Sequence, residues 1–396
     1  MGEKRVLMAE WREDFAKLVS FDSVSFRERQ TADWLKERLE QMGFTVWEDR
    51  AGENYDGNAG NIFGRLDGEL PGAPLLFSAH MDVVEPGKKK KTVFEPNGMI
   101  RSAGNTVLGA DDIAGIIEIL YGISYVIEHH IPHRAIEVVF PIGEEVYIKG
   151  SDVIDYSRLE AKEAYVLDMS GDVGVAARKA PSIISFRVEV HGKASHAGFA
   201  PEAGVHAIQI AAKAIAGLTL GHLEEGTTLN IGMVEGGVAT NIVPESCVCT
   251  GEIRSFRHER ALELVEEVQS IFEKAASETV AASMSGNGET TESDTIAASQ
   301  NIAKITVTHE VHMEAYEVPE DAGVIKHFKE ACEPLGLPGT VGDTFGGSDN
   351  NNFVQNGLEG LVLSCGMYRV HSVEEYTLEK EIEQGIALVA QLLQSK

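Results

Sequence analysis

The sequence has few cysteines: Cys247, Cys249, Cys332 and Cys365 are the four in 396 residues. They form no pair of CxxC motifs and no dense pattern, which argues against a thiolate zinc site and against a disulfide-stapled scaffold. We therefore expect four buried thiols with structural roles. A reducing cytoplasm is the compartment that this cysteine usage predicts.

Long apolar runs and basic residues are also scarce. No stretch of about 18 apolar residues occurs, so no membrane-spanning helix is expected, and the opening "MGEKRVLMAEWRED" lacks the apolar centre of a signal peptide. The 34 Lys and Arg stand against 62 Asp and Glu, a formal net charge of −28. Such a surface repels nucleic acid and anionic membranes, and it attracts cations, including metal ions.

The order of apolar patterns predicts two domains, one inserted into the other. Residues 1–180 alternate strand-like runs with helical segments, beginning with helices near 7–20 and 27–42, which is typical of an α/β layer with a buried sheet. From residue 181 to 316 the order β-α-β-β-α-β, with alternating apolar and polar residues in the strands, predicts a small α+β domain. The α/β pattern returns over 317–396, so both outer segments should form one domain.

Three polar segments are predicted to be solvated surface. The basic run Lys88–Lys91 follows a Pro-Gly pair and is typical of an exposed turn. The histidines of "EHHIPH" lie at the far end of a predicted helix, about 30 Å from its start, and are also expected at the surface. The stretch near 283–300 is rich in Ser, Thr and Gly and predicts an exposed loop.

Imidazole and carboxylate groups stand where predicted strands end. "FSAHMDVV" places His80 and Asp82 two residues apart, hence on one face of an extended chain. Comparable residues occur at other strand ends and at one helix start: Asp111 and Asp112 in "GADD", Glu144 and Glu145 in "PIGEE", Asp168 in "YVLDM", and His371 in "YRVHS".

Each of these residues has an ordinary explanation when it is taken alone, as a helix cap, a solvated carboxylate or an exposed imidazole. Together they would meet beyond the carboxyl ends of strands in one sheet, where open α/β sheets bind ligands. Carboxylates gathered there repel one another unless a cation lies among them. Two histidines with carboxylates and no cysteine suit zinc, cobalt or manganese, and suit two ions that share a carboxylate.

The ordered motifs "HMD", "GADD", "GEE", "LDMSGDVG" and "YRVHS" resemble those of the co-catalytic zinc exopeptidases around peptidase T, whose relatives include aminoacylase, the ArgE/DapE deacylases and the glutamate carboxypeptidases. The resemblance covers nearly the whole chain, including "GKASHAG" and "GGVATNIVP". It implies a three-layer α/β catalytic domain with an inserted α+β lid or dimerisation domain, and two divalent metal ions, zinc in the first place and cobalt or manganese as alternatives.

The resemblance also implies a role for each residue at the strand ends. One ion would be held by three residues: His80, Asp111 and Asp168. The other would be held by a second set that shares the bridging carboxylate: Asp111, Glu145 and His371. Glu144 would be the general base that takes a proton from the attacking water, and Asp82 would orient the ring of His80.

Further residues are implied to contact the substrate. His196 would stabilise the developing oxyanion from the inserted domain, although an exposed loop histidine is the alternative. Asn241 and Arg254 would hold a terminal carboxylate, with a strand-end ion pair as the alternative for Arg254. A glycine-rich loop would cradle the substrate backbone through three residues: Gly346, Gly347 and Ser348.

Asp168 stands at a position where this family also uses Glu, and Asp there tends to accompany aminopeptidases and dipeptidases. The expected substrate is therefore a short peptide with a free N-terminus. Two alternatives stay open: a dimetal deacylase of N-acyl amino acids, and a non-catalytic metal-binding relative. The resemblance further implies a homodimer formed through the inserted domain, with His196 acting in the partner's site.

Overall fold

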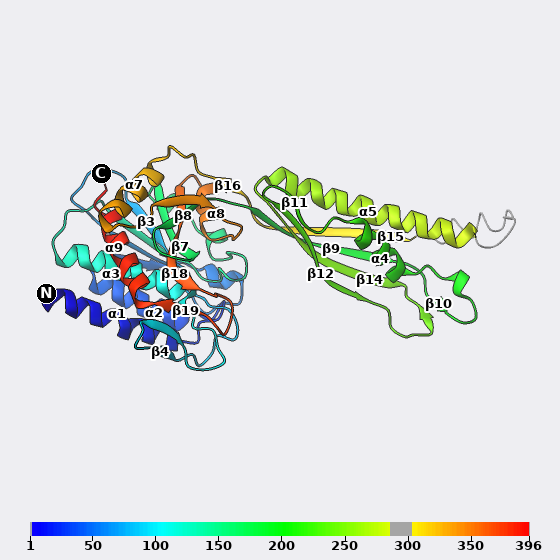
Figure 1. Ribbon diagram of the computed structural model, residues 1–396, viewed down its shortest axis with the longest axis horizontal. Coiled ribbons are helices and arrows are strands. Elements are labelled where there is room, and N and C mark those ends of the chain that lie inside the picture. Colours follow the sequence, from blue (N-terminus) through cyan, green and yellow to red (C-terminus); the bar gives the residue numbers. More distant parts are fainter. Residues whose placement is uncertain (1, 286–302, 396) are drawn as a thin grey trace. The chain divides into compact units, whose positions relative to one another are not determined.

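The computed structural model describes residues 2–285 and 303–395, and for residues 2–9 and 282–285 it describes the backbone alone. The chain divides into two compact units (Figure 1). The outer unit consists of the residues up to Ala180 and those from Tyr316 onward, and the inserted unit is Pro181–Ala315. The predicted loop near 283–300 lies almost entirely outside the described residues.

A large mixed sheet forms the centre of the outer unit. Its main path runs in the order β1-β2-β6-β3-β7-β18-β19-β5-β4. The strands on this path are β1 (Thr45–Glu48), β2 (Ile62–Leu66), β3 (Leu75–Ser78), β4 (Thr92–Phe94), β5 (Met99–Ser102), β6 (Ile136–Phe140), β7 (Glu163–Ser170), β18 (Glu359–Tyr368) and β19 (Tyr376–Leu378). Three more strands join beside β18: β8 (Val175–Ala180), β16 (Tyr316–Glu317) and β17 (Thr340–Asp343).

The four central strands β6, β3, β7 and β18 are parallel, so their carboxyl ends meet at one edge of the sheet. Helices cover the sheet: α1 (Gly2–Ser20), α2 (Arg29–Gln41), α3 (Ala110–Glu128), α7 (Gly323–Cys332), α8 (Asn350–Gln355) and α9 (Glu379–Leu392). Short 3₁₀ turns lie between them at Ala51–Asn54, Ser151–Val153, Tyr156–Arg158 and Glu333–Leu335.

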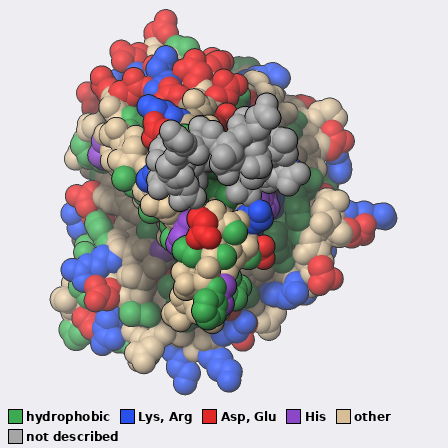
Figure 2. All heavy atoms as spheres, turned by 90° about the vertical axis from the view of Figure 1, so that its right-hand side faces the viewer, with side chains coloured by type: hydrophobic (Ala, Val, Ile, Leu, Met, Phe, Trp, Pro, Cys, Tyr) green, Lys and Arg blue, Asp and Glu red, His purple; other side chains and the backbone are tan. Residues whose placement is uncertain are grey.

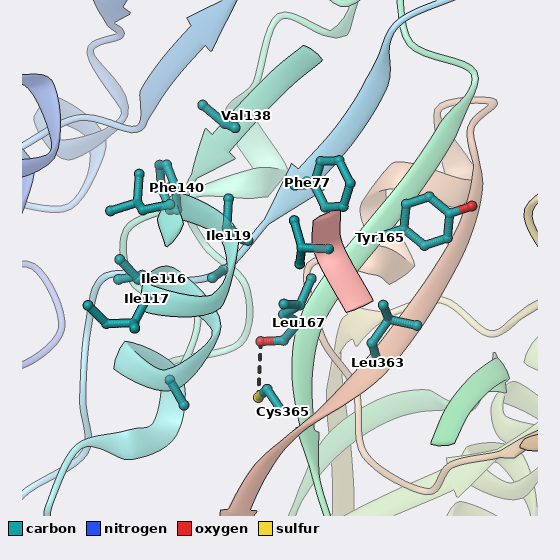
Figure 3. Packing of buried hydrophobic residues seen from close by; sticks show 14 of the residues in the cluster. Phe77, Ile116, Ile117, Ile119, Val138, Phe140, Tyr165, Leu167, Leu363 and Cys365 are labelled. Atoms are coloured by element: carbon teal, nitrogen blue, oxygen red, sulfur yellow. Dashed lines mark hydrogen bonds between the residues drawn. The ribbon is translucent and has the colours of Figure 1, made fainter. Parts of the chain in front are cut away.

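Burial of apolar strand residues against α3 fixes this arrangement. Phe77 of β3 stacks on Tyr165 of β7 with ring centroids 5.6 Å apart, and both are fully buried. Figure 3 shows them packed beside Leu167 and Leu363, with the thiol of Cys365 donating to the carbonyl of Leu167. Each such side chain contributes about 1.5–3 kcal/mol by leaving water, so the central strands are the rigid base of the unit.

The inserted unit has a five-stranded antiparallel sheet in the order β11-β12-β14-β9-β15. Its strands are β9 (Ser182–His191), β10 (Ser195–His196), β11 (Gly221–Glu224), β12 (Thr227–Gly236), β13 (Ile242–Val243), β14 (Ser246–Ser255) and β15 (Lys304–Met313). Its helices are α4 (Ala207–Gly217) and α5 (His258–Ser285), with a 3₁₀ turn at Pro201–Ala203. Buried residues of α4 and α5 share one core with inward side chains of β9 and β14.

The predicted α/β architecture with an α+β insertion is confirmed, and the buried thiols are confirmed for all four cysteines. Two surface predictions are confirmed for most of their residues, since Lys88, Lys89, Lys91, His129 and His130 are exposed, but each is wrong for one residue. Lys90, inside the basic run, is buried because its ammonium donates to the carbonyls of Phe21 and Gly87. His133 is buried because its Nδ1 pairs with the carbonyl of Arg134.

Candidate active site

The candidate metal ligands follow the carboxyl ends of the four central parallel strands. His80 comes two residues after β3, Glu145 follows β6, Asp168 lies near the end of β7, and His371 follows β18. Asp111 stands at the start of α3, after the left-handed Gly109 with φ of +76°. The parallel register of the strands therefore brings residues from five distant parts of the sequence to one edge.

Two groups of possible ligands form there, each with its ligand atoms within 4.8 Å of one another. The first consists of His80, Asp111 and Asp168. Within it, Nε2 of His80 lies 3.1 Å from Oδ1 of Asp111 and 3.7 Å from Oδ1 of Asp168. The side chains of this group are at most a tenth exposed, so an ion held there would be largely dehydrated.

The second group consists of Asp111, Glu145 and His371. Nε2 of His371 lies 3.2 Å from Oδ2 of Asp111 and 3.0 Å from Oε2 of Glu145. The imidazole of His371 is about half exposed, whereas the two carboxylates are buried. Asp111 thus turns one carboxylate oxygen toward each histidine, which is the arrangement of a carboxylate shared by two ions.

The residues fit a pair of divalent cations by two observations. Oε1 of Glu145 is buried and finds no hydrogen-bond donor within the described residues. Burial and then the charges of Glu144, Asp112 and Asp111 raise the pKa of Asp168. Hydrogen bonds that the ring donates to Asp111 and Glu145 raise the pKa of His371 to about 10. A proton on this ring thus balances the carboxylates that a metal cation would balance.

Glu144 belongs to neither group, although it is adjacent to Glu145 and buried. Burial, reinforced by the charges of Glu145, Asp349 and Asp82, raises the pKa of its carboxyl well above the ordinary value. A carboxylate that readily holds a proton at neutral pH is suited to general base chemistry.

Asp82 is fully buried and contacts more than the imidazole of His80. Its Oδ1 lies 3.4 Å from Nδ1 of His80, and it accepts backbone N–H groups of Glu144 at 2.9 Å and Glu145 at 3.2 Å. The hydroxyl of Ser25 donates to it at 2.7 Å. Burial raises the pKa of Asp82, but the hydrogen bonds from His80, Ser25 and Glu144 outweigh burial and lower it.

Two further buried carboxylates hold the backbone of the site. Glu28 accepts the N–H of Gly143 at 3.1 Å, and Glu375 accepts those of Gly109 at 2.7 Å and Asp111 at 2.9 Å. Sequence reasoning missed both. Glu28 lies inside a predicted helix, and Glu375 is one of two adjacent glutamates with no distinguishing pattern.

Asp349 is a third missed carboxylate. It is buried at the start of α8. Burial raises its pKa to about 7, and its charge acts on Glu144.

The glycine-rich loop lies between β17 and α8 in the outer unit. Gly346 is exposed and donates to the hydroxyl of Thr344 at 3.0 Å, Gly347 is half-buried, and Ser348 is buried. The backbone N–H of Ser348 donates to Oδ1 of Asn351 at 3.2 Å. Substrate contact by these three residues stays a prediction.

In the inserted unit, β10 pairs with β13, which brings His196 beside Asn241: the N–H of Ala197 donates to the carbonyl of Asn241 at 2.9 Å. His196 and Asn241 are exposed. Nδ1 of His196 accepts the N–H groups of Gly198 and Phe199, both at 3.1 Å, which leaves Nε2 as the ring nitrogen that can donate.

Arg254 lies in the five-stranded sheet, whereas His196 lies in the separate two-stranded sheet of β10 and β13. On β14 it pairs with Ile183 at the start of β9, whereas β10 follows the end of β9. About eight strand residues, roughly 26 Å, separate these two ends. Nε of Arg254 donates to Oε1 of Glu252 at 2.7 Å. Hence one inserted unit cannot apply His196 and Arg254 to the same end of a short peptide.

The surface and cavities add little to the site. Side chains of both signs are exposed on the face in Figure 2, with Asp and Glu gathered along its upper border. A hollow between α1, α3 and α9 is lined by Trp11, Tyr121 and Ile386 among others, and none of the candidate site residues lines it.

No helix in the described part of the chain is long and apolar enough to cross a membrane.

Known proteins match the chain along its whole length. Residues 179–280 match the family model "Peptidase dimerisation domain", and residues 61–211 match "Peptidase family M28". An uncharacterized protein of Bacillus subtilis, YqjE, is 32% identical over 394 residues, covering 100% of this chain and 99% of that protein.

Two solved structures share the fold and 98% of each chain. A tripeptidase from Staphylococcus aureus superposes with a TM-score of 0.88 at 30% identity. The aminopeptidase PepT from Bacillus cereus superposes with a TM-score of 0.87 at 31% identity. The chain belongs to the peptidase T-like members of the M20 peptidase family.

Proposed function

We propose that this chain, a peptidase by its family, is a dimetal aminopeptidase that releases the N-terminal residue of short peptides, tripeptides in the first place. The observation that carries this proposal is the double role of Asp111, whose two oxygens face His80 and His371. Zinc is the proposed metal, with cobalt and manganese as alternatives for the same donor set.

Residues of the site would have separate roles in the hydrolysis. When bound, two divalent ions lower the pKa of water and polarise the scissile carbonyl. Glu144 accepts the proton of the attacking water and returns it to the leaving nitrogen, so one carboxyl serves both steps. Asp82 holds the ring of His80 and the backbone of Glu144 and Glu145, and thereby fixes base and ligand together.

We further propose a homodimer formed through the inserted unit, in which His196 stabilises the oxyanion in the partner's site. The match to a dimerisation domain supports the dimer. Arg254 pairs with the start of β9, whereas His196 follows the end of β9, and this separation supports delivery of His196 to a second site. Asn241, beside His196, would then contact the same substrate, and Arg254 would hold a terminal carboxylate separately.

The experiment that tests the activity compares a free tripeptide, the N-acetyl tripeptide and N-acyl amino acids as substrates after loading with zinc, cobalt or manganese. Release of the N-terminal amino acid from a free tripeptide, with the N-acetyl tripeptide resistant, supports the aminopeptidase. Hydrolysis of N-acyl amino acids in preference to tripeptides would support the deacylase instead. The deacylase is the second candidate because aminopeptidases and deacylases both belong to the relatives that this chain resembles. If the fully metal-loaded protein hydrolyses none of these substrates, the third alternative, a non-catalytic metal-binding relative, is supported.

A further inference from the structure

We propose that Glu375 is a positioning residue that sets the distance between Asp111 and His371, and so determines how tightly the second ion is held. This inference rests on the proposed function, because it concerns the ions of the same site. Glu375 is a buried carboxylate that is neither a candidate metal ligand nor the proposed general base, and the inference gives it a role.

Glu375 joins two ligand-bearing segments. It lies four residues after His371, in the segment between β18 and β19. Its two oxygens accept different backbone N–H groups of the other segment, Oε2 from Gly109 and Oε1 from Asp111. Its side chain is almost wholly removed from water, so the loss of these bonds leaves buried donors without partners.

The Asp111 segment is shaped to receive a carboxylate. Gly109 has φ of +76°, and a Cβ there would lie 3.0 Å from a side-chain carbon of Val83. Consecutive N–H groups around a left-handed residue converge on one side of the backbone and form an anion-binding concavity. Glu375 fills this concavity, and the direction of the Asp111 side chain depends on the backbone that it fixes.

The backbone conformation of the His371 segment must be held by neighbouring groups. His371 and Arg369 both have left-handed backbones, with φ of +60° and +54°. Such conformations are unfavourable for non-glycine residues and persist where the surroundings enforce them. The exposed ion pair between Arg369 and Glu374 joins two residues of this same segment, whereas Glu375 connects the segment to the buried backbone around Asp111.

The test uses full-length zinc-loaded protein and compares Glu375→Gln with Glu374→Gln. A glutamine keeps the shape and offers one acceptor oxygen, so one of the two N–H groups loses its partner. Glu374 is the matched control because it is adjacent, has the same side chain and is exposed. Zinc affinities of both sites are measured by competition with a chelator, and the melting temperature of the metal-free proteins is recorded beside them.

We expect Glu375→Gln to weaken zinc binding at the second site, with its half-exposed His371, about 10–100-fold, the range for residues that orient ligands. The effect on the other site should be smaller, and Glu374→Gln should have none. Affinities equal to wild type, or an equal loss at both sites, would overturn the proposal. If Glu375→Gln does not fold, Glu375→Asp is measured in the same way, and unchanged zinc affinity there would overturn the proposal as well. Wild-type protein that binds no zinc would instead overturn the proposed function.

Discussion

Oδ1 of Asp82 accepts the backbone N–H of Glu144 at 2.9 Å. The residue expected to orient a ligand therefore also holds the proposed base. Asp82→Ala removes the partner of two buried N–H groups and of the His80 ring at once. We expect a loss of about 10–100-fold in metal affinity or turnover, measured by zinc titration and steady-state kinetics. Ser25→Ala, which removes one donor to the same carboxylate, should have a much smaller effect, and an equal effect would contradict this assignment.

Glu144→Gln keeps the shape of the side chain but cannot accept a proton. We expect turnover to fall by about 10²–10⁴, the range for a positioned general base, while zinc content stays at the wild-type level. The matched variant is Glu145→Gln, which should lose zinc. If Glu144→Gln loses zinc and Glu145→Gln keeps it, the two roles are reversed.

Mixing two inactive variants tests delivery of His196 to the partner. Losing an oxyanion donor costs roughly 10²–10³ in turnover, so His196→Ala and Glu144→Gln should each be nearly inactive. In a mixed dimer one site has an intact Glu144 and receives an intact His196 from the partner, and the other site lacks both. Random reassembly at equal ratio should restore about a quarter of wild-type activity per site.

The same experiment separates the two alternatives for His196. If the imidazole acts within its own chain, mixed dimers stay as inactive as their parents. Mixed dimers verified by two different affinity tags and still without activity would therefore contradict delivery in trans.

Buried Lys90 predicts a dependence of stability on pH. Burial lowers its pKa from 10.5 to about 8. Between these values the unfolded chain binds more protons than the folded chain, so the free energy of unfolding should rise with pH across this window. Denaturant titrations of wild type and Lys90→Met at pH 7.5 and pH 10 measure it, and the wild type should gain stability relative to the variant. An equal change in both proteins would show that Lys90 is not the source.

The architecture could be predicted because apolar periodicity reports burial, and burial decides these elements. The motifs around His80 and Asp111 indicated ligands since they stand at strand ends. Glu28 and Glu375 could not be found in this way, because accepting backbone N–H groups requires no pattern in the sequence. Lys90 was misjudged for a related reason: two carbonyls from distant residues satisfy it, and the sequence does not show that they converge.

The most direct test of the two-ion site is an anomalous difference map at the zinc edge from crystals of the zinc-loaded protein. We predict two peaks on either side of the Asp111 carboxylate, about 3.5–4 Å apart, one beside His80 and the other beside His371. A single peak, or two peaks that do not share Asp111, would contradict the account.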